Sequence, residues 1–96
     1  MSIYGNRDTT VYANFSATQG PFTLYGGQYA VTIHAATWGT VTLQRLAADG
    51  VSYVTCLTAF TADGYATVNL PAGSYRFLVA TATGVYADIT SVVVSF

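Results

Sequence analysis

The feature that most constrains this chain is an alternation of apolar and polar residues with a period of two. No segment shows a sustained 3.6-residue period, so the pattern predicts strands and not helices. β-branched and aromatic residues fill the alternating runs, as strands prefer. In the run QYAVTIHAAT one face carries Tyr29, Val31, Ile33 and Ala35.

Two other runs lead to specific expectations. TVYANF predicts a strand with Val11, Ala13 and Phe15 on one face. VSYVTCLTAF, residues 51–60, has apolar groups on both faces, which is typical of a central strand.

Turn residues separate these runs at regular intervals. Asp49-Gly50 and Asp63-Gly64 stand between alternating segments, where glycine supports tight hairpin turns, and they predict successive hairpins of a meander. The stretch LPAGSYRF predicts a Pro71–Gly73 turn that sets the register of two core strands. Leu70, Tyr75, Phe77 and, two residues further on, Val79 should point to one face of the sheet, and Arg76 should point to the other.

We therefore expect an all-β fold, either an antiparallel β-sandwich or a jelly-roll-like small barrel of about seven or eight short strands. The 96 residues suffice for a single β domain over residues 1–96. Residues 16–21 look like a loop, so residues 1–20 would form an extended N-terminal arm with the first strand. A frayed terminus is the alternative.

Charged residues make up only 7% of the chain, against about 25% in an average soluble domain. The chain has no Lys and no Glu. Either the surface is polar but uncharged, or much of it is buried in an assembly, where charges are depleted and aromatic residues enriched. Eight Tyr and five Phe favour the assembly.

The same charge pattern argues against two kinds of partner. A net charge of −1 without a basic cluster disfavours nucleic acid and a polybasic membrane contact. No apolar run approaches the roughly 18–20 residues of a spanning helix. MSIYGNRDTT lacks the pattern of a signal peptide, so we expect synthesis in a cytoplasm, which the single Cys56 also fits.

Catalytic chemistry is poorly supplied. His34 is the only histidine and reads as a structural or surface residue, and Cys56 reads as a small buried hydrophobe. Asp49 and Asp63 are explained as turn formers. A Cys–His pair would need neighbouring strands. We expect no enzyme, no cofactor, no catalytic residues and no metal site.

The low charge, GTVTLQ, the DG turns, LPAGSYRF and GVYADITSV together resemble small β proteins encoded among the head genes of tailed bacteriophages and prophages. These are capsid decoration, or cement, proteins. The resemblance covers residues 26–92. It implies a β-sandwich or jelly-roll-like domain, often trimeric, that binds the major capsid protein on the exterior of the virion and stabilises the head. We therefore expect a homo-oligomer, with a trimer favoured.

Candidate interface residues follow from the chemistry of contacts. The arginines offer directional, bidentate bonds to carboxylates, and Trp38 serves as an anchor in the core or in an interface. The candidates are Ile3, Tyr4, Arg7, Trp38, Arg45 and Arg76. The alternatives are a carbohydrate-binding, lectin-like sandwich whose aromatic rings stack on sugars, or another structural component of a phage tail or virion.

Overall fold

The computed structural model describes residues 9–92, and these residues form eight strands and no helix. This confirms the all-β prediction. The described part therefore also contains no helix that could span a membrane. The strands are β1 (Thr9–Phe15), β2 (Gln19–Leu24), β3 (Gly27–Thr37), β4 (Thr40–Leu46), β5 (Tyr53–Thr55), β6 (Gly64–Leu70), β7 (Gly73–Ala80) and β8 (Thr83–Ser91).

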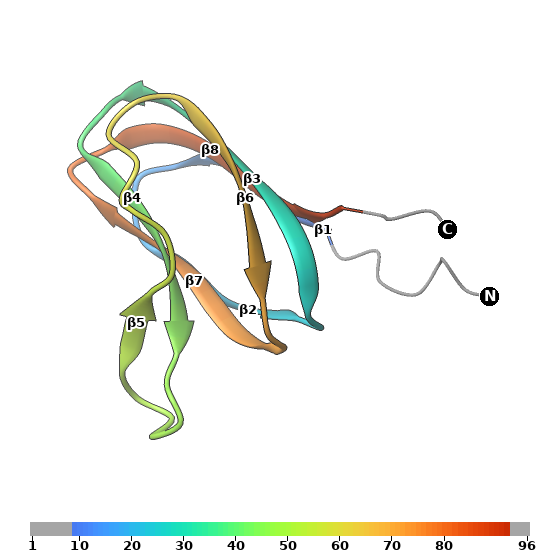
Figure 1. Cartoon of the computed structure of the whole chain (residues 1–96). Helices are drawn as coiled ribbons and strands as arrows, with labels where there is room; N and C mark the ends of the chain where they lie inside the picture. The colour runs from blue at the N-terminus through green and yellow to red at the C-terminus, as the bar shows by residue number, and fades with distance from the viewer. Residues whose placement is uncertain (1–8, 93–96) are drawn as a thin grey trace.

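The strands form two antiparallel four-stranded sheets that pack face to face (Figure 1). Sheet A has the order β1-β8-β3-β6, and sheet B has the order β2-β7-β4-β5. The pairs β1·β8, β2·β7, β3·β6 and β4·β5 are all antiparallel. Strands β1 to β4 therefore pair in order with β8 to β5 as one long two-stranded ribbon. The β3·β8 and β4·β7 pairings fold this ribbon into the two sheets. This is the jelly-roll topology.

The core lies between the two sheets and comes from the inward faces of their strands. The predicted face of β3 is confirmed, because its four alternating apolar residues are all buried. Leu70, Tyr75 and Phe77 are also buried as predicted, and Val79 packs partly buried against them. The fully buried side chains of largest volume are Tyr29, Tyr75, Phe77, Leu24, Ile33, Leu43, Ile89, Val31, Val41 and Val85.

The predicted face of β1 is wrong. A bulge interrupts the pairing with β8 between Tyr12 and Phe15, and Asn14 takes a positive φ of 54° there. The extra residue changes which side chains point inward. Phe15 is buried as expected, but Val11 is 65% exposed and Tyr12 packs against the core instead.

Three predictions about connections are also wrong. β6 and β7 belong to different sheets, so the Pro71–Gly73 turn crosses between sheets and sets no hairpin register. The segment before Asp63 likewise crosses from sheet B to sheet A, so only Asp49-Gly50 closes a hairpin, and there is no meander. The segment 51–60 contributes only the short edge strand β5 and an isolated bridge from Phe60 to Val41.

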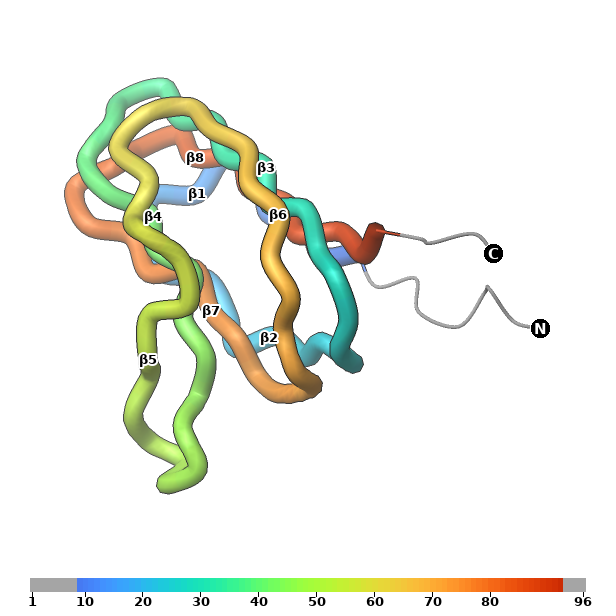
Figure 2. Tube along the Cα trace, viewed as in Figure 1, coloured from blue at the N-terminus to red at the C-terminus, as the bar shows by residue number. Residues whose placement is uncertain are grey.

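The sandwich is closed along one side and open along the other. β1 contacts β2 where the two sheets meet, whereas β5 makes no contact with β6. The tube in Figure 2 shows the β4–β5 hairpin extending away from β6. The predicted loop over 16–21 is shorter than expected, because β2 already begins at Gln19.

Candidate interaction surfaces

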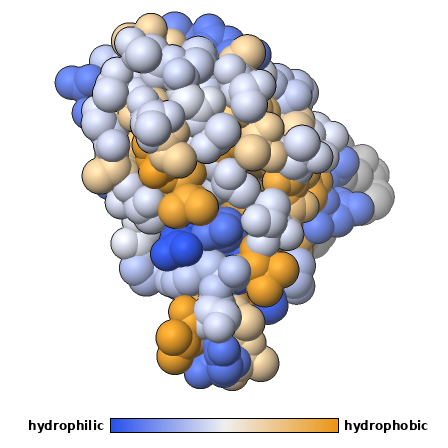
Figure 3. Space-filling model, turned by 90° about the vertical axis from the view of Figure 1, so that its left-hand side faces the viewer, coloured by the Kyte–Doolittle hydropathy of each residue, from blue (hydrophilic) through white to orange (hydrophobic). Residues whose placement is uncertain are grey.

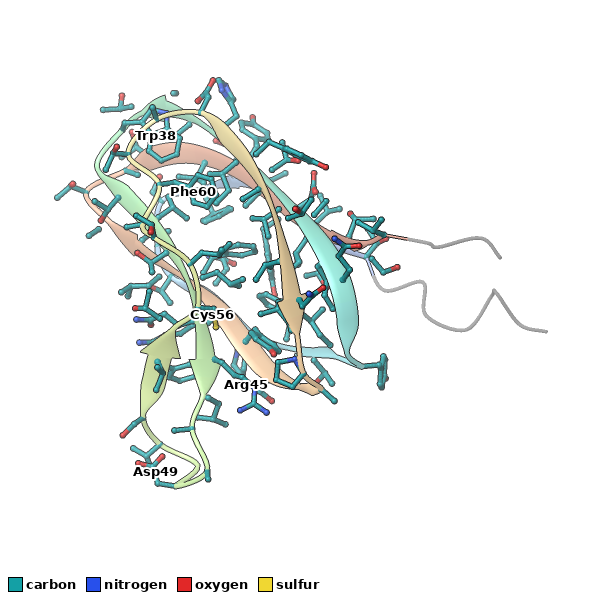
Figure 4. All side chains as sticks on the ribbon, viewed as in Figure 1. Trp38, Arg45, Asp49, Cys56 and Phe60 are labelled. Atoms are coloured by element: carbon teal, nitrogen blue, oxygen red, sulfur yellow. The ribbon has the colours of Figure 1, made fainter. Side chains whose placement is uncertain are left out.

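The structure separates the predicted interface residues. Trp38 lies at one end of the sandwich and Arg45 at the other, close to the turn between β6 and β7 (Figure 4). Arg45 and Arg76 occupy neighbouring strands of sheet B, but they point to opposite faces, because Arg45 pairs with Tyr75 and Arg76 pairs with Gln44. The predicted residues Ile3, Tyr4 and Arg7 lie outside the described residues.

Trp38 belongs to a polar cluster centred on Asp63. The indole Nε1 donates to Asp63 Oδ1 at 2.9 Å, and the amide of Ala35 donates to the same oxygen at 3.3 Å. His34 Nδ1 lies 2.7 Å from Asp63 Oδ2. These bonds, first that of His34 and then that of Trp38, lower the pKa of the Asp63 carboxyl.

The Asp63 cluster fastens the crossing segment to the end of β3. The sequence alone suggested only a turn-forming role for Asp63, but the residue also holds this segment to β3. The side chains of His34 and Asp63 are 60% and 59% exposed, so their contact is well solvated and contributes little stability. Trp38 is partly buried and packs against the core while its nitrogen reaches Asp63.

Arg45 lies on the inner face of sheet B and holds the turn between the sheets. Its Nη2 donates to the carbonyl of Ala72 at 2.8 Å, and the guanidinium carbon lies 6.0 Å from the centre of the Tyr75 ring. The Tyr75 hydroxyl donates to the carbonyl of Pro71 in the same turn. Burial raises the pKa of the Tyr75 hydroxyl. Arg45 is thus committed to an internal contact.

The Nε atom of Arg45 is buried, and no described residue accepts a hydrogen bond from it. Beside it is a shallow hollow of about 370 Å³ on the inner side of the β4–β5 hairpin. A second hollow, of about 460 Å³, lies where residues 57–64 pass Ala66 of β6. The sequence pattern did not indicate either hollow. The first is lined by Arg45, Leu46, Ala47, Ala48, Val54 and Cys56.

Arg76 lies on the outer face of sheet B. Its Nε donates to Gln44 Oε1 at 2.8 Å, and its guanidinium carbon sits 3.9 Å from the centre of the Tyr53 ring. Within residues 9–92 its two terminal nitrogens have no hydrogen-bond acceptor. Figure 3 shows this side of the molecule, where hydrophobic patches flank a hydrophilic centre. Arg76 is therefore a pre-oriented donor for an external carboxylate.

Little in the described part favours catalysis. His34 is in sheet A, and Cys56 follows β5 of sheet B, so the Cys–His pair is not brought together. Cys56 is only partly buried, not fully as predicted, and burial raises the pKa of its thiol. Within residues 9–92 no three His, Cys, Asp or Glu side chains gather as metal ligands.

The four sheet edges differ in how well they are protected against pairing. The β1 edge carries the bulge at Asn14, and the β2 edge carries Pro21 and an irregular register between Gln19 and Phe22. β5 has only three residues. β6 has seven residues, GYATVNL, with no proline and no charge, and its register with β3 is unbroken from Leu70 to Gly64. β6 is thus the unguarded edge of the described strands.

Comparison with known proteins adds no relative to this description. No family model matches the chain, and no curated protein and no solved structure is significantly similar to it.

Proposed function

We propose that this chain is a structural protein that attaches to a large assembly, and specifically that it decorates the shell of a tailed-phage head. In this role it binds the major capsid protein from outside and stabilises the head. The capsid interpretation comes from the resemblance of residues 26–92 to phage decoration proteins. The jelly roll supports it only by analogy, because capsid and lectin domains both use this topology.

The observation that carries the proposal is how the few charges are used. Asp49 accepts bonds from Val51 and Ser52 in its own turn, Asp63 is bonded to β3, and Arg45 is bonded to Ala72. Of the five charged side chains in residues 9–92, these three bond within the chain, and Arg76 bonds to Gln44 through its Nε alone. Asp49 and Asp63 stay exposed, so the exterior keeps their charge but offers few charged groups that are free to bind a partner. Large neutral or apolar patches usually mark contacts.

Such a surface attaches by shape, apolar burial and backbone pairing. We expect attachment to survive high salt, since screening weakens only exposed charge contacts. Arg76 is the exception, because its free nitrogens can bind a carboxylate of the shell. Ile3, Tyr4 and Arg7 stay predicted contact residues of an N-terminal arm.

The test is co-sedimentation with undecorated shells of the major capsid protein from the same genome, at low and high salt. Binding should persist in high salt, and Arg76→Ala should weaken it, whereas Thr32→Ala on the outer face of sheet A should not. Deleting residues 1–8 tests the arm separately. Failure of the wild-type protein to pellet with these shells would refute the capsid role. Binding on a glycan array would favour the lectin-like alternative instead.

A further inference from the structure

We propose that two copies of this chain pair through their β6 edges, antiparallel and about a two-fold axis at Thr67, so that two sheets A become one eight-stranded sheet. This pairing does not depend on attachment to a shell. The β6 edge can accept a strand because β5 makes no contact with it and β6 has no bulge, no proline and no charge. The crossing segment, residues 57–63, passes only its first residues, at Gly64 and Ala66, where a hollow separates the two.

The second copy is the occupant that fits this edge, because β6 complements itself. A two-fold axis at Thr67 places Thr67 opposite Thr67 of the other copy and Tyr65 opposite Asn69. These three side chains are the exposed ones of the strand, and they lie on its outer face. On the inner face Ala66 meets Val68, and both are partly buried in the single chain. Thr–Thr pairs across strands are favourable, and no like charges meet.

The same geometry covers surface that the single chain leaves open. The Tyr65 side chain is 66% exposed, more than any other large hydrophobic side chain of β6. In the pair its ring would lie over Asn69 of the neighbouring copy. The backbone groups of β6 that point away from β3 would also gain partners.

The symmetry of this contact is specific. An isologous contact, in which the same patch is used by both copies, closes as a dimer. A closed trimer built by edge pairing would need β6 to pair with a different edge, and the other three edges are short, bulged or carry proline.

Introducing like charges at the two-fold axis tests the proposal. Thr67→Lys places two lysines opposite each other, and Thr67→Asp places two aspartates opposite each other. Each variant should dimerise about fivefold more weakly, or worse, which corresponds to about 1 kcal/mol for like charges directly opposite. An equimolar mixture of the two should associate again, because position 67 then carries opposite charges. High salt should partly restore each single variant.

The matched control is Thr32→Lys, which adds the same charge on the outer face of β3, one strand away from the edge. It should leave dimerisation unchanged. Light scattering after size exclusion should give the wild type twice the 10.1 kDa mass of one chain. Circular dichroism of each variant shows that it is folded.

Any of three results overturns the proposal: a wild-type mass of one or three chains, a dimer that Thr67→Lys does not weaken, or a mixture of the two variants that does not associate.

Discussion

The turn between β3 and β4 provides a sharp test of the packing described above. A Cβ atom added at Gly39 would lie 1.9 Å from Thr81 Oγ1, 2.2 Å from the Ala80 carbonyl oxygen and 2.9 Å from the Ala82 nitrogen. Two of these three atoms belong to the backbone, so they cannot turn aside as a side chain would. Gly39→Ala must therefore move the turn between β7 and β8 away from the β3–β4 turn.

The loss of stability in Gly39→Ala can be compared with that in a second variant, Gly50→Ala. Overpacking costs about 1–3 kcal/mol and occasionally more, and the clash at Gly39 is severe, so we expect at least about 3 kcal/mol. Gly50 has nothing within 4 Å of an added Cβ but has a φ of +77°. Gly50→Ala should cost only the left-handed conformation, about 1–2 kcal/mol. The stiffer unfolded chain offsets about 0.4–1 kcal/mol of this.

The assay is denaturant unfolding of both variants at one fixed protein concentration, followed by circular dichroism and by the fluorescence of Trp38, the only tryptophan. A fixed concentration matters because any self-association adds to apparent stability. Gly39→Ala should be clearly the less stable. If it unfolds within about 0.5 kcal/mol of the wild type, or is more stable than Gly50→Ala, the described contact between the two turns is wrong.

Three further outcomes follow from the contacts. Gly73→Val should destabilise by about 1–2 kcal/mol, since its Cβ would lie 3.0 Å from the Arg45 side chain, which can shift; an unchanged melting temperature would contradict this. The pKa of the Asp63 carboxyl is lowered in the folded state, so its contribution to the free energy of unfolding is present above about pH 4 and is lost as the pH falls. Urea unfolding should therefore show that the difference in stability between wild type and Asp63→Asn narrows in acid and not in base. Because burial raises the pKa of the Cys56 thiol, it should react with a thiol reagent more slowly than free cysteine at pH 8, and equal rates would show that it is exposed.

The sequence predicted the strands better than their connections. Period-two alternation located most strands and the inward face of β3, because a buried face fixes which residues alternate. It failed in β1, where one extra residue at Asn14 shifts the register and Asn is among the few non-glycine residues that tolerate a positive φ. The turn at Pro71 was located but misread, because a turn signal does not say whether the next strand pairs with the last or crosses to the other sheet.

The candidate site residues were predicted by type but not by role. Trp38, Arg45 and Arg76 were chosen as groups able to make strong contacts, and each does so within the chain. Only the geometry shows that Arg45 holds the turn at Ala72, whereas Arg76 keeps two nitrogens without a described acceptor. The role of Asp63 was missed because its partners His34 and Trp38 are 29 and 25 residues away along the chain.

The absence of lysine leaves fewer sheet edges unprotected in the structure than the composition suggested. From composition alone, every sheet edge seemed unprotected, because lysine is a common guard against edge pairing. The edges of β1, β2 and β5 are in fact blocked by a bulge, a proline and shortness, none of which needs charge. Absence of charge therefore leaves only β6 open among the described strands. One open edge in an otherwise blocked sandwich limits pairing to a single partner strand, and such pairing closes instead of growing into a fibre.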